Sequence, residues 1–346
     1  MKQTLTIRGR IDLSKFVILA TIVFLGLAAI VPYRAYTQDE SEIGEATQTT
    51  PLIGVTSSTK NPLQVALLHW YDANQTASFA VGFQPFALAF DGANIWVANL
   101  ESHSVTKLRA SDGATLGTFG VEAPLGVAFD GGNVWVTNSG INAVTKLRAS
   151  DGKTLGTFAV GTNPIGVAFD GANVWVANTI GNTVTKLRAS DGKTLGTFEA
   201  GGGPYNVAFD GANIWVTNNG SKSVSKLRAS DGKTLGTFAV GNIPIGIAFD
   251  GANIWVANSS SGTVTKLRAS DGETLGTFVV GGPPAGVAFD GANIWVTNGG
   301  NSVSKLRASD GKTLGTFTVG NYPIGVAFDG ANIWVSNFNG HSVCKL

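Results

Sequence analysis

Side chains that could hold a metal or move a proton are sparse in this sequence. It contains three histidines and one cysteine, and two of the histidines, His103 and His341, each stand four residues after the asparagine that ends a recurring WVxN motif. Two histidines and a carboxylate such as Glu122 would make a minimal set for a divalent ion or for acid–base catalysis. Other copies of the motif carry Asn, Lys or Gly at the histidine position, as exposed turns do. We therefore expect turn or recognition residues here, and we predict no catalytic residue, no metal site and no cofactor.

Aspartate precedes glycine at regular intervals, seven times as FDG and six times as SDG. Repeated carboxylates invite a calcium interpretation, but Asp before Gly is also typical of a tight turn in which the carboxylate caps backbone amides, and we expect turns. Lys107 and Arg109 belong to a KLR triplet that also recurs. Their alternation with Thr106 and Leu108 predicts a solvated strand edge or pairing with Asp, rather than an anion site.

A repeat of 39 or 40 residues positions these side chains. Seven tryptophans mark the repeat: Trp96, Trp135, Trp175, Trp215, Trp255, Trp295 and Trp334. Such a period is typical of four-stranded propeller blades. In the third unit, period-two alternation predicts strand a at 164–169, strand b at 174–178, strand c at 183–189 and strand d at 194–200, with Asp-Gly turns after strands a and c. The sequence therefore predicts an all-β fold, a seven-bladed β-propeller of four-stranded antiparallel blades.

Two features of the repeat predict how the blades pack. Strand a places Ile165, Val167 and Phe169 on one face and only Gly166 and Ala168 on the other, which would let the neighbouring blade approach near the propeller axis. The tryptophan of strand b is expected between adjacent sheets, where it buries a large apolar surface. Because a lone sheet of this length cannot bury both faces, we expect the blades to be stable only as a closed ring.

The two ends of the repeat region predict how the ring closes. The last unit stops at HSVCKL without a fourth strand, whereas the segment WYDANQTASFAVG at 70–82 parallels the end of the other units. TASFAV would then supply the outer strand of the seventh blade and remove an exposed edge. The segment VALLHW at 65–70 resembles a further strand c, which would either pack outside the ring or belong to an eighth blade.

The first part of the chain has a different character. Basic residues precede the apolar run FVILATIVFLGLAAIV at 16–31, and acidic residues follow it. We interpret residues 1–33 as a cytoplasmic basic segment and a transmembrane helix acting as an uncleaved signal anchor, or else as a cleaved signal peptide. Residues 34–63 would form a flexible linker, and residues 64–346 the propeller. The propeller is thus expected to be membrane-anchored and extracytoplasmic, in the periplasm or at the cell surface, or secreted after cleavage.

Composition excludes several classes of function. A formal net charge of +1 and a charged fraction of 14% give no clustered positive surface for nucleic acid. The single cysteine, Cys344, permits no intramolecular disulfide, no redox pair and no cysteine-rich metal site. We expect Cys344 to be a passive strand residue, and stability to come from packing.

The motif WVTN at 135–138, 215–218 and 295–298, within the frame PxGVAFDGxN[IV]WV[AT]N, resembles the YVTN-type β-propeller repeat, which is related to NHL and virginiamycin B lyase-like propellers. The resemblance covers residues 64–346 and implies a propeller fold. It implies no single activity, since similar propellers serve as scaffolds, sensors, binding modules and enzymes. A lyase activity would imply metal-assisted β-elimination, with a histidine and acidic residues at the propeller mouth, but strand a of every unit lacks histidine.

The units differ from one another mainly in the d–a and b–c connections, which emerge on the same side of an up-and-down blade. This face is the candidate for binding, because variable loops on a rigid scaffold carry function. The candidate binding residues are Phe83, Phe86, Glu101, His103, Glu122, Tyr205, Tyr322, Phe338 and His341. We expect a binding or scaffold module for a protein or a cell-envelope polymer. A lyase- or hydrolase-like enzyme with its site at the mouth of the central channel, using Glu122, His103 or His341, is the alternative.

Overall fold

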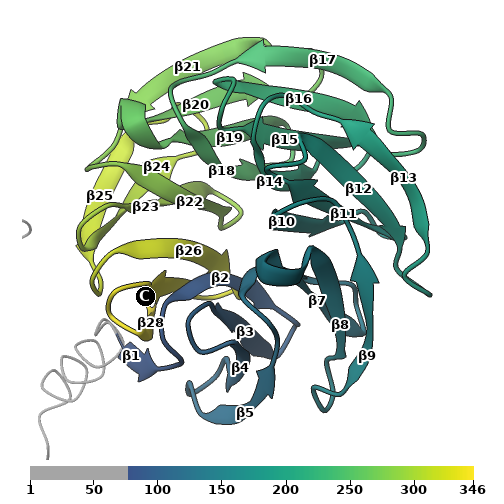
Figure 1. Ribbon diagram of the computed structural model, residues 1–346. Helices are drawn as coiled ribbons and strands as arrows, with labels where there is room; N and C mark the ends of the chain where they lie inside the picture. The colour runs from purple at the N-terminus through teal and green to yellow at the C-terminus, as the bar shows by residue number, and fades with distance from the viewer. Residues whose placement is uncertain (1–76) are drawn as a thin grey trace, which may run out of the picture. The chain divides into compact units, whose positions relative to one another are not determined.

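The computed structural model describes residues 77–346, and this part of the chain forms seven four-stranded antiparallel sheets set around a central axis. Each sheet is one blade, and Figure 1 looks down the axis. Its strands carry the β-branched and aromatic residues that favour extended backbone, and Asp-Gly turns separate them. The predicted seven-bladed propeller is confirmed, and the strand ends lie within one residue of those expected for the third unit.

From the axis outward, the strands are, in blade 1, β2 (Pro85–Phe90), β3 (Asn94–Asn99), β4 (Ser104–Arg109) and β5 (Thr115–Gly120); in blade 2, β6 (Pro124–Phe129), β7 (Asn133–Asn138), β8 (Ala143–Arg148) and β9 (Thr154–Ala159); in blade 3, β10 (Pro164–Phe169), β11 (Asn173–Asn178), β12 (Thr183–Arg188) and β13 (Thr194–Glu199); in blade 4, β14 (Pro204–Phe209), β15 (Asn213–Asn218), β16 (Ser223–Arg228) and β17 (Thr234–Ala239); in blade 5, β18 (Pro244–Phe249), β19 (Asn253–Asn258), β20 (Thr263–Arg268) and β21 (Thr274–Val279); in blade 6, β22 (Pro284–Phe289), β23 (Asn293–Asn298), β24 (Ser302–Arg307) and β25 (Thr313–Thr318); and in blade 7, β26 (Pro323–Phe328), β27 (Ile333–Asn337), β28 (Ser342–Lys345) and β1 (Ala77–Ala80). Two 3-10 helices, η2 (Ser139–Ile141) and η3 (Ser259–Ser261), lie in b–c connections.

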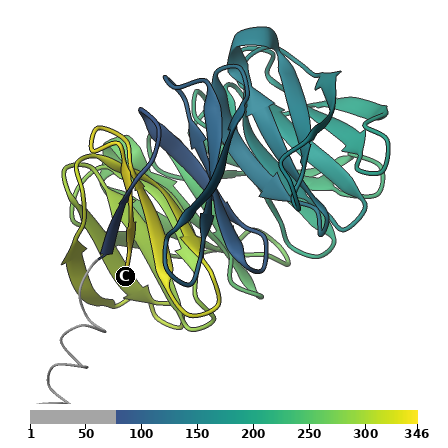
Figure 2. The ribbon, with the colours of Figure 1, turned by 90° about the horizontal axis from the view of Figure 1, so that it is seen from below.

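Blade 7 joins the two ends of the repeat region. β1 pairs antiparallel with β28, with Ala77 opposite Lys345 and Ala80 opposite Ser342, and Phe79 of β1 stacks on Trp334 at 5.5 Å. The edge-on view in Figure 2 shows this first described strand beside the C-terminus. The prediction that an amino-terminal strand completes the last blade is confirmed, and the other predicted strand, 65–70, lies outside the described residues.

The core lies between adjacent blades, as the tryptophan spacing predicted. Trp175 of blade 3 is fully buried and packs with Ile214 and Leu227 of blade 4. Close approach of the sheets depends on small residues in the innermost strand: a Cβ added to Gly166 would lie 2.5 Å from the Cα atom of Asn206 in the next blade. Glycine is therefore required at this position in blade 3.

The expectation of a solvated lysine on strand c is wrong. Lys186 is 6% exposed, and its Nζ lies 5.0 Å from the centre of the Trp175 ring and donates to the carbonyl oxygen of Ala229 in the next blade at 2.6 Å. Strand c lies inside the sheet and between two neighbouring blades, so both of its faces are buried, and the ammonium group is stabilised by the indole face and a backbone acceptor. Arg188 is exposed and pairs with Asp191 as expected.

No helix within residues 77–346 has the length and apolarity needed to cross a bilayer. The predicted membrane segment at 1–33 and the predicted linker at 34–63 lie outside the described residues, so both stay predictions.

Candidate binding face at the mouth of the central channel

The variable connections of each blade are joined to one another on one side of the ring. Leu100 N–H donates to the carbonyl of Gln84 at 3.0 Å, and Ser139 N–H donates to that of Ala123 at 3.1 Å. The b–c turn therefore lies against the d–a connection that leads into the same blade. We call this side the loop face; it comprises 81–84, 100–103, 121–123, 139–142, 160–163, 179–182, 200–203, 219–222, 240–243, 259–262, 280–283, 299–301, 319–322 and 338–341.

The opposite side of the ring, the uniform face, consists of the FDG and SDG turns. Asp170 accepts hydrogen bonds from the backbone N–H groups of Ala172 and Asn173 and from Trp175 Nε1 at 2.7 Å. Burial of the Asp170 carboxyl opposes its ionisation, but these hydrogen bonds outweigh burial and lower its pKa. The same bonds recur in all seven blades. These carboxylates are thus part of the scaffold, which supports the turn interpretation.

The two histidines of the loop face act as connectors between blades. His103 Nδ1 accepts a hydrogen bond from Ala123 N–H at 3.2 Å, across the boundary between blades 1 and 2. His341 Nδ1 accepts one from Gln84 N–H at 3.2 Å, across the boundary between blades 7 and 1. Asn142 makes the corresponding bond to Asn163. All three residues have φ near +50°, a conformation that Asn and His tolerate better than most residues. The histidines therefore lie at successive blade boundaries and do not form one site together.

Two predicted residues accompany the histidines. Glu122 Oε1 lies 3.2 Å from His103 Nδ1, and both side chains are more than half exposed. Phe83 is 61% exposed and meets the His341 ring edge-on at 4.8 Å. Glu101 is exposed on the b–c turn of blade 1. Within residues 77–346, no group of three or more His, Cys, Asp or Glu side chains is arranged to hold a metal ion.

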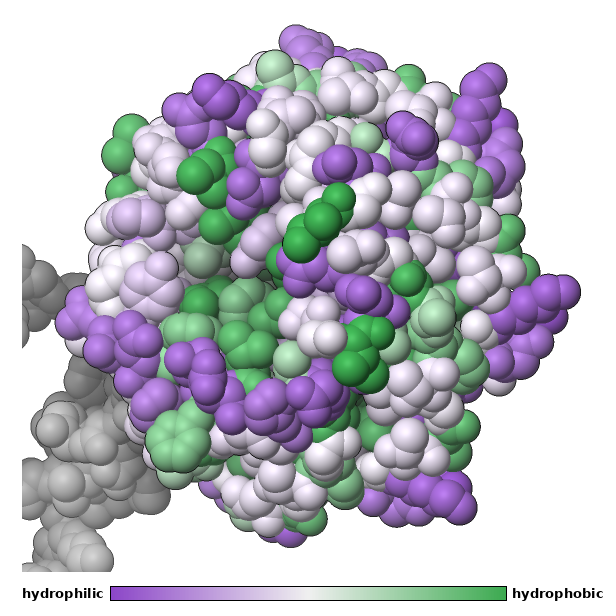
Figure 3. Space-filling view, viewed as in Figure 1, coloured by the Kyte–Doolittle hydropathy of each residue, from purple (hydrophilic) through white to green (hydrophobic). Residues whose placement is uncertain are grey.

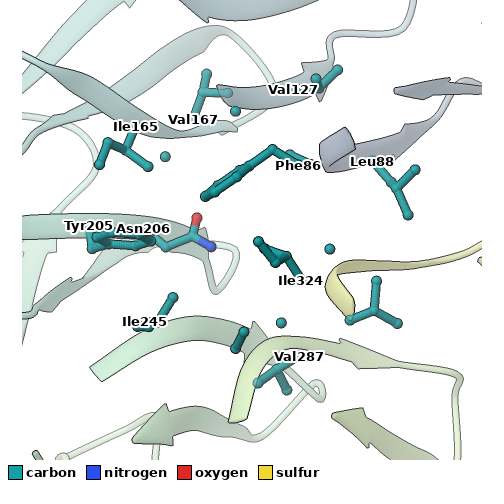
Figure 4. Close-up of a pocket in the computed structure, with 17 residues that line it drawn as sticks. Phe86, Leu88, Val127, Ile165, Val167, Tyr205, Asn206, Ile245, Val287 and Ile324 are labelled. Atoms are coloured by element: carbon teal, nitrogen blue, oxygen red, sulfur yellow. The ribbon is translucent and has the colours of Figure 1, made fainter. Parts of the chain in front are cut away.

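The inner strands of all seven blades enclose a channel of about 160 Å³. Figure 4 shows Phe86 and Asn206 directed into it from nearly opposite sides. Most of the other lining residues are glycine or aliphatic, and Figure 3 shows apolar surface gathered in a hollow near the middle of the ring. Neither histidine and no carboxylate lines this channel.

A second cavity, of about 150 Å³, forms the mouth of the channel on the loop face. We call it the mouth pocket; it is lined by Phe86, Tyr205, Ile245, Ser259, Pro283, Ala285, Gly299, Tyr322, Pro323 and Ile324. Phe338 packs beside it, with its ring 6.3 Å from that of Phe86 and 6.1 Å from that of Tyr322. Burial, and to a lesser degree the neighbouring Tyr322, raises the pKa of Tyr205 to about 12. Tyr205 therefore stays a neutral hydrogen-bond donor at physiological pH.

The structure thus brings four of the nine sequence-predicted residues, Phe86, Tyr205, Tyr322 and Phe338, together at the channel mouth. It places His103, Glu122, Phe83 and His341 at two blade boundaries of the loop face. Sequence reasoning missed Asn206 and Ala285, although both depart from the Pro-Ile-Gly that begins strand a in blades 3, 5 and 7. It also missed Ile180, which is 68% exposed on the loop face.

Solved propeller structures are similar to this chain in fold. Kuenenia stuttgartiensis hydrazine synthase superposes with a TM-score of 0.68 at 19% sequence identity, covering 76% of this chain and 95% of that chain. A streptogramin B lyase superposes with a TM-score of 0.68 at 18% identity, covering 78% of this chain and 96% of that one. No protein-family model and no curated protein sequence matches the chain. Residues 77–346 therefore form a seven-bladed β-propeller similar in fold to these two structures, and at these identities the likeness extends to the fold alone.

Proposed function

We propose that this protein binds a protein or cell-envelope polymer through its loop face, as a membrane-tethered, extracytoplasmic propeller. The observation that carries this proposal is the apolar character of the loop face around the mouth pocket. Phe83, Ile141, Ile180, Ile243 and Tyr322 all expose large side chains there. Exposed apolar surface beside a pocket is typical of interaction sites, and of these five residues Tyr322 lines the mouth pocket itself.

The contrast between the two faces supports the same proposal. On the uniform face, the recurring Asp side chains are occupied by bonds to turns and tryptophans, so their identity is explained by folding. On the loop face, the exposed Ile141 and Ile180 occupy positions at which the other repeats have Gly, Ser, Asn or Glu, so the fold does not require an apolar side chain there. Tethering to a membrane rests on the basic and apolar segments of residues 1–33, and catalysis at the mouth lacks the histidine and carboxylate that the lyase-like alternative needs there.

A crosslinking pull-down from the cell-envelope fraction tests the proposal. The bait is the full-length chain, and a loop-face variant carries Phe83→Ser, Ile180→Ser and Tyr322→Ser. A matched control carries Leu195→Ser and Leu235→Ser, at positions that are similarly exposed but lie on outer strands. We expect a partner that the parent and the control capture and that the folded loop-face variant loses. Capture of the same molecules by all three proteins, or of none by any, would refute binding through the loop face.

A further inference from the structure

Departures from the repeat occur together where strand a faces the channel. Its second and third residues are Ile-Gly in blades 3, 5 and 7, but Phe86-Ala87 in blade 1, Tyr205-Asn206 in blade 4 and Ala285-Gly286 in blade 6. The rest of the strand hardly changes. The second residue of each of these three blades lines the mouth pocket. The fold accepts isoleucine at this position in three blades, yet blades 1, 4 and 6 depart from it at the wall of one cavity.

These departures shape the mouth pocket. Ala285 stands between Ile245 and Ile324 of the neighbouring blades, and its small side chain leaves open the space that isoleucine fills elsewhere. Phe86 and Tyr205 provide aromatic walls, and Tyr322 rises beside them, 47% exposed. The volume of about 150 Å³ is enough for one benzene-sized ring, and it is well below the roughly 300 to 1,000 Å³ of sites for drug-sized ligands. The mouth pocket itself therefore has room for a single side chain.

The lining selects for an uncharged group. No Asp, Glu, Lys, Arg or His lines the pocket, and burying an unpaired charge there would be costly. The side chain of Tyr205 supplies a neutral donor at the wall. A large apolar or aromatic side chain satisfies both the volume and the polarity.

The surrounding loop face selects for the residues that flank this side chain. Glu101, Glu122 and Glu199 lie on this face or at its strand ends, and Lys222 is the one lysine or arginine among those residues. Glu199 ends an outermost strand, so on the loop face itself Glu101 and Glu122 stand against Lys222, and the face carries a net negative charge. Complementary charge around an apolar anchor steers association and favours a basic partner.

We propose that the mouth pocket receives one large apolar side chain from a segment of a partner protein whose neighbouring residues are basic. The inference rests on the proposed function, because it names the kind of partner that the loop face binds. An apolar anchor in a central pocket supplies most of the affinity of many interfaces, and the rim supplies specificity.

The test uses synthetic peptides as probes for the full-length chain held in lipid nanodiscs. One fluorescently labelled peptide has a single tryptophan flanked by lysines in a Gly/Ser background. In two matched peptides, the tryptophan is replaced by alanine or the lysines by glutamates. On the protein side, Ala285→Ile introduces the isoleucine of blades 3, 5 and 7 and fills the pocket. The double variant Tyr205→Ile with Asn206→Gly gives blade 4 the Ile-Gly pair of the same three blades. Leu125→Ile, at the same strand position of blade 2 but outside the mouth pocket, is the control.

We expect the lysine-flanked tryptophan peptide to bind, and its affinity to fall at least about tenfold, or about 1.4 kcal/mol, with Ala285→Ile but not with Leu125→Ile. The alanine and glutamate peptides should bind the parent protein no more tightly than the tryptophan peptide binds Ala285→Ile. Because the substitutions copy residues that other blades already carry, an unchanged thermal transition is expected for each variant. Equal binding of the tryptophan and alanine peptides, equal binding by the parent and Ala285→Ile, or no binding of any peptide would overturn the inference. In each of those cases, a partner captured in the pull-down and lost by the loop-face variant would leave the proposed function standing.

Discussion

Asp170 and its six counterparts show how one side chain can serve a turn and a core together. The carboxylate closes the a–b hairpin through Ala172 and Asn173, and it also accepts the indole N–H of the fully buried Trp175. A buried donor without a partner costs more than a single hydrogen bond gains. The FDG motif is therefore explained by its Asp carboxylate, which caps the turn amides and also accepts a hydrogen bond from the indole buried between two blades.

Replacing Asp170 by alanine should destabilise the protein by about 2 to 4 kcal/mol, because one indole donor and two turn amides lose a charged acceptor. Urea unfolding measures this change. The matched control is Asp191→Ala in the exposed SDG turn, where Asp191 pairs with Arg188 in solvent and the loss should be within about 1 kcal/mol. Equal losses at the two positions would contradict the role given to the indole bond.

Tyr205 gives a prediction for alkaline pH. Its pKa is raised to about 12 in the folded protein, whereas an unfolded tyrosine ionises near pH 10. Between these values the unfolded chain binds fewer protons than the native one, so the free energy of unfolding must fall as pH rises from about 10 to about 12. Denaturation of Tyr205→Phe across this range should show a smaller fall than the parent, and the two should have parallel pH dependence below pH 9 or so. Identical slopes above pH 10 would contradict the burial of this hydroxyl.

At the residue scale, the sequence predicted chemistry better where the neighbours are local. The Asp-Gly turns and the Arg188–Asp191 pair involve residues at most five apart, and both were predictable. Lys186 was not, because its acceptor, Ala229, lies 43 residues away in the next blade. From sequence alone, a lysine in a strand with period-two alternation is expected to face solvent, because the sequence does not show that a second sheet covers it.

At the scale of elements, strand a decides how closely two blades approach. Gly166 meets the backbone of Asn206, whereas Gly132, in the a–b turn of blade 2, has only the Asp130 carboxylate near the position of a Cβ. Thr137 joins successive inner strands further, since its hydroxyl accepts from Gly126 N–H at 2.7 Å and donates to the carbonyl of Ile165 at 2.8 Å. Small side chains here let backbone meet backbone.

Gly166→Ala should therefore cost about 1 to 3 kcal/mol, because the added methyl group overlaps the next blade and forces it away. Gly132→Ala should be neutral or stabilising by up to about 1 kcal/mol, since it restores the alanine of the other blades and restricts the unfolded chain. Thermal and urea unfolding of the two variants give the comparison. Equal effects would mean that the innermost strands are less closely packed than the structure shows.

At the scale of the whole molecule, the repeat predicted the blade number and the closure, since both follow from the phase at which the units begin and end. It also predicted that the variable connections share one face. The mouth pocket could not be predicted, because Phe86, Tyr205, Ala285 and Tyr322 come from four different blades and meet only when the ring closes. The sequence repeat predicts the face of the ring on which a residue lies, but it does not predict which residues of different blades meet across the propeller axis.

A circular permutant tests whether the join in blade 7 is interchangeable with the ordinary blades. The chain would begin at Gly82 and run to Leu346, continue through an added Arg-Ala-Ser-Asp-Gly-Lys-Thr segment copied from the other units, and end with residues 76–81. We expect one cooperative thermal transition near that of residues 76–346, because β1 would reach the same pairing with β28 through a covalent turn. A broad or multi-step transition would mean that blade 7 folds properly only when β1 and β28 are not joined by a covalent turn.

The pairing of β1 with β28 also sets an order of events during synthesis. Ala77 meets Lys345, 268 residues later in the chain, so this is the most non-local contact of the ring. At roughly 5 to 20 residues per second, β1 waits on the order of 10 to 50 s for its partner to leave the ribosome. All strands of blades 1 to 6 are made before β28 (Ser342–Lys345), whereas the seventh blade cannot form until β28 has been synthesised. Until then the ring is open at blade 7, and β1, a strand of only four residues, is the one that is left waiting.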